Sequence, residues 1–166
     1  MFSRKALAAL PLMLMASTAT HAGIEEGDKT VSIFGALTFD EFTDSLTVQA
    51  AGGLFVTDTL EVQGVALLVS SEDDFGNVSA TSGYGMNANL YLPGGDPDFI
   101  PYVGGGGTLI LTDFNGTTDT AFGLNGQAGI KQFLNESVSV NYQAQFITSS
   151  DYDATIFSVG FTIFLD

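Results

Sequence analysis

The chain has 166 residues, with 4 Lys and Arg against 19 Asp and Glu, and with 45% hydrophobic and 14% charged residues. This balance excludes an intrinsically disordered acidic tail, and the length allows one domain, or two at most. The absence of cysteine excludes disulfides, thiolate catalysis, zinc–thiolate sites and iron–sulfur clusters.

Residues 1–22 have the pattern of a secretory signal peptide. A short positive region precedes an apolar run at 6–16, and the segment ends at 20–22 (THA), a small residue, any residue and then Ala. The run is too short to span about 30 Å of hydrocarbon, and Pro11 interrupts it, which argues against a membrane anchor. We therefore expect cleavage, which leaves residues 23–166 as the folded domain.

Removal of the signal peptide changes the charge and the catalytic options of the chain. Lys29 and Lys131 are then the cations against 19 acidic residues, a formal net charge of 2 − 19 = −17, and the single histidine, His21, is lost. Catalysis of proton transfer near neutral pH usually depends on histidine, and the remaining residues offer no nucleophile–base pair. We therefore expect no enzyme activity and no cofactor. The lack of a basic patch argues against nucleic acid as a partner.

The folded domain is predicted to consist of eight β-strands. It has no apolar run of about 18 residues that could form a transmembrane helix. Apolar and polar residues instead alternate with period two in segments bounded by Gly, Pro, Asn, Asp or Ser. The segments span 29–40, 45–57, 60–71, 78–92, 99–113, 119–133, 137–149 and 154–165. The alternation is least regular in the third segment, where Val65, Leu67 and Val69 occupy the polar face.

The polar faces of these segments decide between two closed β-architectures. In the seventh segment one face is Val138, Val140, Tyr142, Ala144 and Phe146, and the other is Ser139, Asn141, Gln143 and Gln145. Small and amide residues suit the narrow interior of an eight-stranded barrel, whereas a water-facing sheet would favour Lys, Glu and Arg. Strands of about 10 residues can cross a bilayer, where only a closed barrel pairs every backbone group. The sequence therefore predicts an all-β fold, an eight-stranded antiparallel up-and-down transmembrane β-barrel. A soluble, secreted lipocalin-like barrel with inverted faces is the less favoured alternative.

The connections between the segments alternate in character. Those after the second, fourth and sixth segments, at 57–59, 93–97 and 134–136, suit periplasmic turns. Those after the first, third, fifth and seventh segments carry Asp or Glu. An even number of strands places both chain ends on the periplasmic side, so the acidic loops are expected outside.

Three segments resemble parts of the small outer-membrane β-barrels of Gram-negative bacteria, the OmpA/OmpX type. They are 100–104 (IPYVG), 126–131 (GQAGIK) and 157–164 (FSVGFTIF). Together with the signal peptide and the eight alternating segments, they extend the resemblance over nearly the whole mature chain. The resemblance implies an integral protein of the cell outer membrane. Its implied partners are outer-membrane lipids and lipopolysaccharide, and during biogenesis the barrel-assembly machinery and periplasmic chaperones.

Aromatic residues fall near both ends of the expected strands. Phe55, Tyr91, Phe99, Tyr102, Phe133 and Phe164 fall near the expected periplasmic ends, and Phe39, Phe42, Tyr84, Phe114, Phe122, Phe146 and Phe157 fall nearer the outer ends. We interpret the two sets as the interfacial aromatic girdles of a membrane barrel. The alternative is that strand propensity alone enriches Phe and Tyr.

Two charged residues are expected inside the barrel. Glu61 and Lys131 both fall on inward-facing positions near the periplasmic third. Because a buried charge must be paired, we predict that they approach each other as an ion pair that helps to plug the interior. The alternative is that either side chain reaches water at the barrel mouth.

The only metal-ligand candidates are Glu72, Asp73 and Asp74, in an expected outer loop. Carboxylate oxygens are the hard ligands that Ca²⁺ prefers. The segment lacks the EF-hand spacing, and a solvated loop tip is the favoured interpretation.

Two kinds of non-enzymatic function remain. The first is a structural or surface-interaction role in the outer membrane, which we favour. The second is a narrow channel for small solutes. Because side chains normally fill an eight-stranded interior, conduction requires that small residues leave continuous water. The candidates are Gly83, Gly85, Gly104, Gly106, Gly123 and Gly129.

Overall fold

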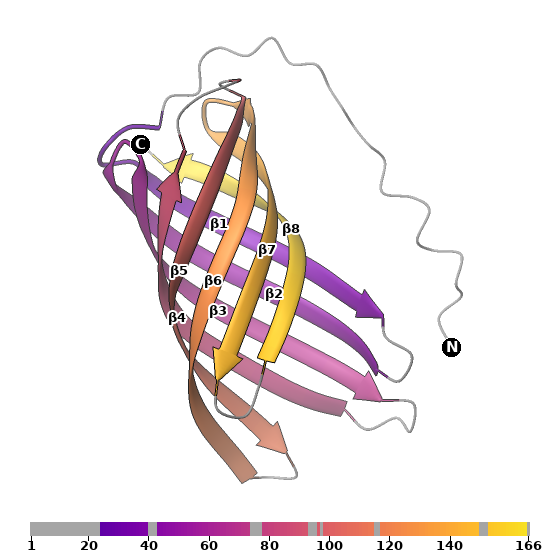
Figure 1. The fold of residues 1–166 in the computed structure, drawn as a ribbon. Coiled ribbons are helices and arrows are strands. Elements are labelled where there is room, and N and C mark those ends of the chain that lie inside the picture. The colour runs from indigo at the N-terminus through magenta and orange to yellow at the C-terminus, as the bar shows by residue number, and fades with distance from the viewer. Residues whose placement is uncertain are drawn as a thin grey trace, which may run out of the picture.

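The computed structural model describes residues 24–39, 43–73, 78–92, 96, 98–114, 117–149 and 153–165, which form a closed antiparallel β-barrel (Figure 1). The strands are β1 (Lys29–Phe39), β2 (Thr43–Thr57), β3 (Leu60–Asp73), β4 (Val78–Tyr91), β5 (Phe99–Phe114), β6 (Thr117–Asn135), β7 (Val138–Ser149) and β8 (Asp153–Leu165). Each strand pairs with its neighbours in sequence, and β1 pairs with β8 to close the barrel. The expected eight-stranded up-and-down barrel is confirmed. In the described part of the chain, no helix is long and apolar enough to cross a membrane.

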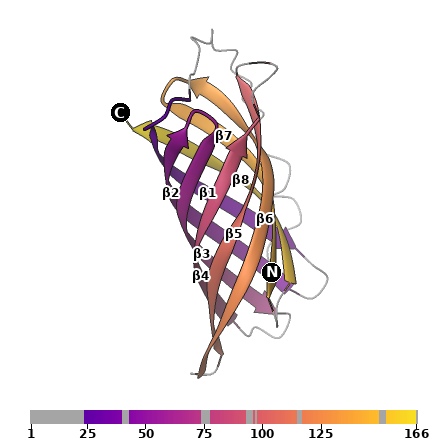
Figure 2. The same ribbon diagram turned by 60° about the vertical axis from the view of Figure 1, so that its left-hand side comes forward.

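The two ends of the barrel differ in their connections, as Figures 1 and 2 show. At one end, here called the turn end, β2–β3 and β6–β7 are joined by tight turns. The backbone N–H of Leu60 donates to Thr57 Oγ1 at 3.1 Å, and that of Ser137 donates to Asn135 Oδ1 at 2.9 Å. The described chain also begins and ends here, at Ile24 and Leu165. The opposite end is called the loop end.

Side chains alternate between the interior and the outer surface along every strand. In β7, the burial pattern alternates from Val138 to Phe146, with Ser139 and the amides inside and the apolar residues outside. Buried polar residues from all eight strands fill the interior, among them Ser32, Gln49, Gln63, Asn87, Thr108, Gln127, Asn141 and Thr162. Large apolar residues are exposed on the outer surface, among them Ile33, Leu68, Met86, Leu109, Leu124, Tyr142 and Phe161. This arrangement inverts that of a soluble barrel and suits a hydrocarbon solvent.

Candidate functional site in the barrel interior

The interior near the turn end holds two charged side chains, Glu61 of β3 and Lys131 of β6. Their exposed fractions are only 0% and 2%. Each lies two residues before another buried side chain of its strand, Gln63 in β3 and Phe133 in β6. The period of two along a strand therefore directs both charges inward, as expected from the sequence.

Hydrogen bonds hold the carboxylate of Glu61 from two other strands. One oxygen accepts from the hydroxyl of Thr30 in β1, and the other accepts from the hydroxyl of Tyr91 in β4 at 2.6 Å. Gly53 in β2 provides the space for this group, because a Cβ atom there would collide with the Glu61 carboxylate and the Thr30 hydroxyl. A buried carboxylate is tolerated only when its oxygens are hydrogen-bonded, and here both have a donor.

The ammonium of Lys131 makes no hydrogen bond to the carboxylate of Glu61, with which we expected it to pair. Its Nζ makes no hydrogen bond with any residue that the structure describes. The ammonium instead lies 4.9 Å from the ring centroid of Tyr91, 5.0 Å from that of Phe164 and 5.8 Å from that of Phe55. Cation–π attraction to these aromatic faces replaces part of the hydration that the ammonium loses on burial. Tyr91 thus contacts both charges, with its hydroxyl on Glu61 and its ring near Lys131.

An aromatic cluster packs inside the barrel at the turn end. Its buried members are Phe55, Tyr91 and Tyr102, and Ile24, Ile100 and Phe164 pack against them. The centroids of neighbouring rings lie 5.1 Å apart for Phe55–Tyr91 and 5.3 Å apart for Tyr91–Tyr102. The segment before β1 crosses this end, and the backbone N–H of Gly27 donates to the carbonyl of Phe55 at 2.8 Å. We call the six residues Phe55, Tyr91, Tyr102, Ile24, Ile100 and Phe164 the turn-end cluster.

Amide side chains fill the middle of the interior. Gln127 donates to Asn89 at 2.5 Å and accepts from Asn87 at 3.2 Å. Gly104 and Gly106 lie beside these amides, and a Cβ atom at either glycine would collide with an amide oxygen of Asn89 or Asn87. The six glycines considered for a water-filled passage all have a neighbouring atom within 3.2 Å of an added Cβ. Side chains or backbone of adjacent strands therefore occupy the space beside each of them.

The loop end of the interior is apolar. Leu67, Ile110 and Ile147 form a buried cluster, and Val69 and Ile156 pack against it. We call these five residues the loop-end cluster. The loop-end cluster explains why the alternation is irregular in the third segment, because Leu67 and Val69 belong to this apolar cluster and not to the amide-rich middle.

A comparison of the sequence with protein families identifies the family of this chain. Residues 6–163 match the outer membrane protein beta-barrel domain family. The chain belongs to this family. The expected likeness to small outer-membrane barrels of the OmpA/OmpX type and the location in the outer membrane are thereby confirmed.

Solved structures of other outer-membrane barrels share the fold of this family member. The N-terminal barrel domain of OprF from Pseudomonas aeruginosa is 14% identical with a TM-score of 0.68, covering 84% of this chain and 98% of that one. OprG from Pseudomonas aeruginosa is 14% identical with a TM-score of 0.64, and the match covers 88% of this chain and 99% of OprG. Neisserial surface protein A is 11% identical with a TM-score of 0.63, and the match covers 83% of this chain and 97% of that protein. A comparison with curated proteins finds no match.

The aromatic residues of this outer-membrane barrel differ from the expected pair of girdles. At the turn end, Phe99 is exposed as expected, but Phe55, Tyr91, Tyr102 and Phe133 are at most 5% exposed and Phe164 packs against the turn-end cluster, so the predicted girdle there is wrong for five of its six residues. The physical reason is strand parity, which turns these rings into the interior and away from lipid. At the other end the exposed residues are Tyr84, Phe122, Phe146 and Phe157, as expected for a girdle. The side chains of Phe39, Phe42 and Phe114 lie outside the described residues.

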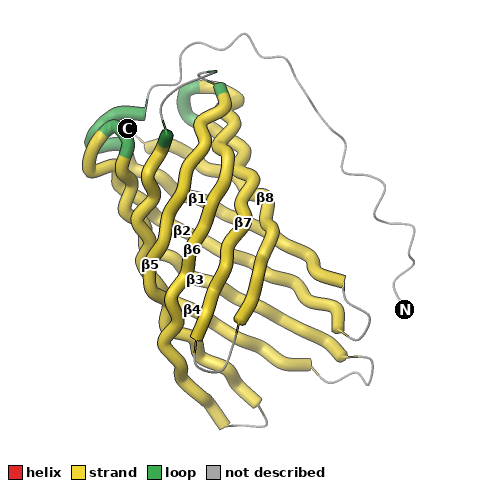
Figure 3. The backbone as a smooth tube through the Cα atoms, in the orientation of Figure 1, coloured by secondary structure: helices red, strands yellow, loops and turns green. Residues whose placement is uncertain are grey.

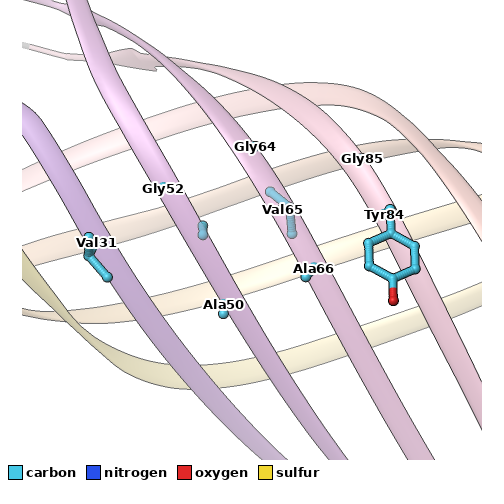
Figure 4. A pocket seen from close by; sticks show the side chains of 9 residues that line it. Val31, Ala50, Gly52, Gly64, Val65, Ala66, Tyr84 and Gly85 are labelled. Atoms are coloured by element: carbon cyan, nitrogen blue, oxygen red, sulfur yellow. The ribbon is translucent and has the colours of Figure 1, made fainter.

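A shallow hollow of about 490 Å³ lies on the lipid-facing side of β1–β4 (Figure 4). Its floor consists of small residues that face each other across β2 and β3, Ala50 opposite Ala66 and Gly52 opposite Gly64. Figure 4 shows the larger side chain of Tyr84 at one side of this floor. Because the lining is almost entirely apolar and looks toward hydrocarbon, the hollow suits lipid packing and offers little to a polar solute.

The acidic metal candidates are not placed by the structure. Asp74 and the side chains of Glu72 and Asp73 lie outside the described residues, as does the expected signal peptide. Within the residues that are described, no group of three or more His, Cys, Asp or Glu could hold a metal ion.

Proposed function

We propose that this protein is a non-enzymatic outer-membrane β-barrel with a structural or surface-interaction role, whose interior is closed to solutes. The packing at the turn end supports the proposal, because aromatic rings surround the buried ammonium of Lys131 there. The loop-end cluster adds a second apolar layer. A narrow channel is the competing function, and the amide-rich middle of the interior is the feature that favours it.

Planar-bilayer recording on the purified, folded barrel tests this proposal. A silent barrel supports a closed interior, whereas a steady single-channel conductance would favour the channel. Folding of each sample is checked by gel migration before and after boiling, because a folded barrel shifts mobility on heating. The double variant K131A/F55A removes the ammonium and one ring that lies near it, and conductance in this variant alone would locate the block to solutes at the turn end.

We further propose that Glu61 and Lys131 act as an indirect ion pair, joined through Tyr91. Their burial supports this, since two uncompensated charges inside a narrow barrel would be costly. The absence of histidine after residue 21 supports the non-enzymatic assignment.

Biogenesis follows from the same proposal. Cleavage after Ala22 would leave Gly23 as the first residue, directly before Ile24 of the turn-end cluster. The barrel-assembly machinery and periplasmic chaperones are then the partners during export. Intact-mass measurement on protein purified from outer membranes tests the cleavage site, and a mass that includes residues 1–22 would contradict it.

A further inference from the structure

The seam between β1 and β8 is paired along only part of its length. The pairing runs from Lys29↔Leu165 to Gly35↔Val159 and stops there. Residues 36–39 of β1 continue to pair with β2, and residues 153–158 of β8 continue to pair with β7. Within the described chain, the loop-end part of this seam therefore has two strand edges without a partner. Figures 1 and 3 show the loop-end parts of β1 and β8 diverging.

The open part of the seam lies at the loop end of the barrel. Phe157, in the unpaired part of β8, is 75% exposed, more than any other large apolar side chain that the structure describes. Unpaired backbone groups are costly in hydrocarbon, so this edge is best placed where polar headgroups meet the acyl chains. Its free N–H and C=O groups need hydrogen-bonding partners there.

The open seam gives lipid a direct contact with the apolar part of the interior. Ile156 of the loop-end cluster is half-buried and packs against the buried members of that cluster. It belongs to the stretch of β8 that is not paired with β1. A hydrocarbon chain lying between the separated edges would therefore cover Ile156 and extend the loop-end cluster outward. Burial of apolar surface would stabilise such a complex.

The negative charge of the protein limits which polar headgroup such a ligand can carry. The described cations, Lys29 and Lys131, both lie toward the turn end, and the chain after residue 22 carries 19 acidic residues. Asp153 begins β8 beside the open seam and is exposed. A carboxylate or phosphate head would be repelled, whereas a hydroxyl could hydrogen-bond to the unpaired backbone.

We propose that the open part of the β1–β8 seam binds a single-chain, uncharged amphiphile with a hydroxyl head, taken from the membrane. Its chain lies against Ile156, and its hydroxyl bonds to the free strand edges of residues 36–39 and 153–158.

The first test is whether the seam is open in the folded protein. Continuing the register of the paired part would place Ala36 opposite Ser158, so A36C/S158C should form a disulfide readily if the seam were closed. The matched control is S32C/T162C, an inward-facing pair of the same register whose native hydroxyls lie 2.6 Å apart. A lipid-facing pair, V31C/I163C, is a second control. The chain has no other cysteine to interfere.

Both controls should cross-link under mild oxidation in folded barrels, and A36C/S158C should not. Cross-linking is measured by gel mobility and intact mass after the heat-shift gel has shown that each variant is folded. Cross-linking of A36C/S158C as fast as the controls would overturn the open seam, and with it the site.

The second test detects the ligand directly. Because the chain has no tryptophan, Ile156→Trp gives a single reporter at the seam, and Phe122→Trp on β6 is a matched lipid-exposed control. The probe is a terminally brominated long-chain alcohol, which quenches nearby tryptophan. We expect saturable quenching at position 156, reversed by the unbrominated alcohol, and only non-saturable quenching at position 122.

Equal and non-saturable quenching at both positions would overturn the site. The matching brominated fatty acid should not saturate at position 156, and if it quenches there as well as the alcohol, the uncharged head is wrong. Reversal of the quenching by an added edge-strand peptide alone would also overturn the proposal, since the seam would then bind protein.

Discussion

Tyr91 donates a 2.6 Å hydrogen bond to Glu61, and the centroid of the same ring lies 4.9 Å from the ammonium of Lys131. One aromatic side chain therefore stabilises two opposite charges that do not touch each other. The carboxylate of Glu61 and the ammonium of Lys131 therefore both lie beside the aromatic rings of the turn-end cluster.

Tyr91→Phe should isolate the hydroxyl from the ring. The variant keeps the ring near Lys131 but removes a donor to the buried Glu61 carboxylate, which should lower the free energy of unfolding by about 2 kcal/mol. Tyr142→Phe is the control, because that hydroxyl is exposed and makes only a 3.5 Å contact with Gln132. Urea unfolding in lipid vesicles measures both variants, and equal stability of the two would contradict the role of Tyr91.

A double-mutant cycle should show that Glu61 and Lys131 depend on each other. Glu61→Gln leaves a buried ammonium without its counter-charge, and Lys131→Met leaves a buried carboxylate, so each change should cost about 3 kcal/mol. The double variant E61Q/K131M removes both charges and should be more stable than the sum of the single effects predicts. Additive losses in the same unfolding assay would show that the two charges are independent.

Gly129→Ala should disturb the packing of the turn-end cluster. An added Cβ would lie 2.6 Å from the Tyr102 ring and from the carbonyl of Tyr142, and overpacking of this kind costs about 2 kcal/mol. Gly126→Ala lies on the same strand with no atom within 4 Å of its added Cβ and should be nearly neutral. A comparable loss of stability in both variants would mean that glycine content, and not the space beside Tyr102, determines the effect.

The sequence predicted the barrel because its alternation of apolar and polar residues survives in the structure. The positions of Glu61 and Lys131 inside the barrel followed from the same period of two. The direction of Phe55 could also have been found, because its neighbours Leu54 and Val56 are the exposed ones. The expected girdle was wrong at the turn end because position along a strand does not decide which way a side chain points, whereas parity does.

The arrangement around Lys131 could not have been predicted in the same way. Its contacts come from Phe55, Tyr91 and Phe164, which belong to three different strands. Which side chains meet inside a barrel depends on strand tilt and register, and periodicity alone does not fix these. The short pairing of β1 with β8 is a property of register for the same reason.

The most direct test of the account is the direction of side chains along β8. Nitroxide labels on single cysteines replacing Phe161, Ile163 and Thr162, all in the paired part of the strand, would be measured for collision with oxygen, which concentrates in hydrocarbon, and with a water-soluble nickel complex. The account predicts high oxygen accessibility at positions 161 and 163 and low accessibility to both reagents at position 162. High oxygen accessibility at 162, with 161 and 163 protected, would contradict the inverted barrel.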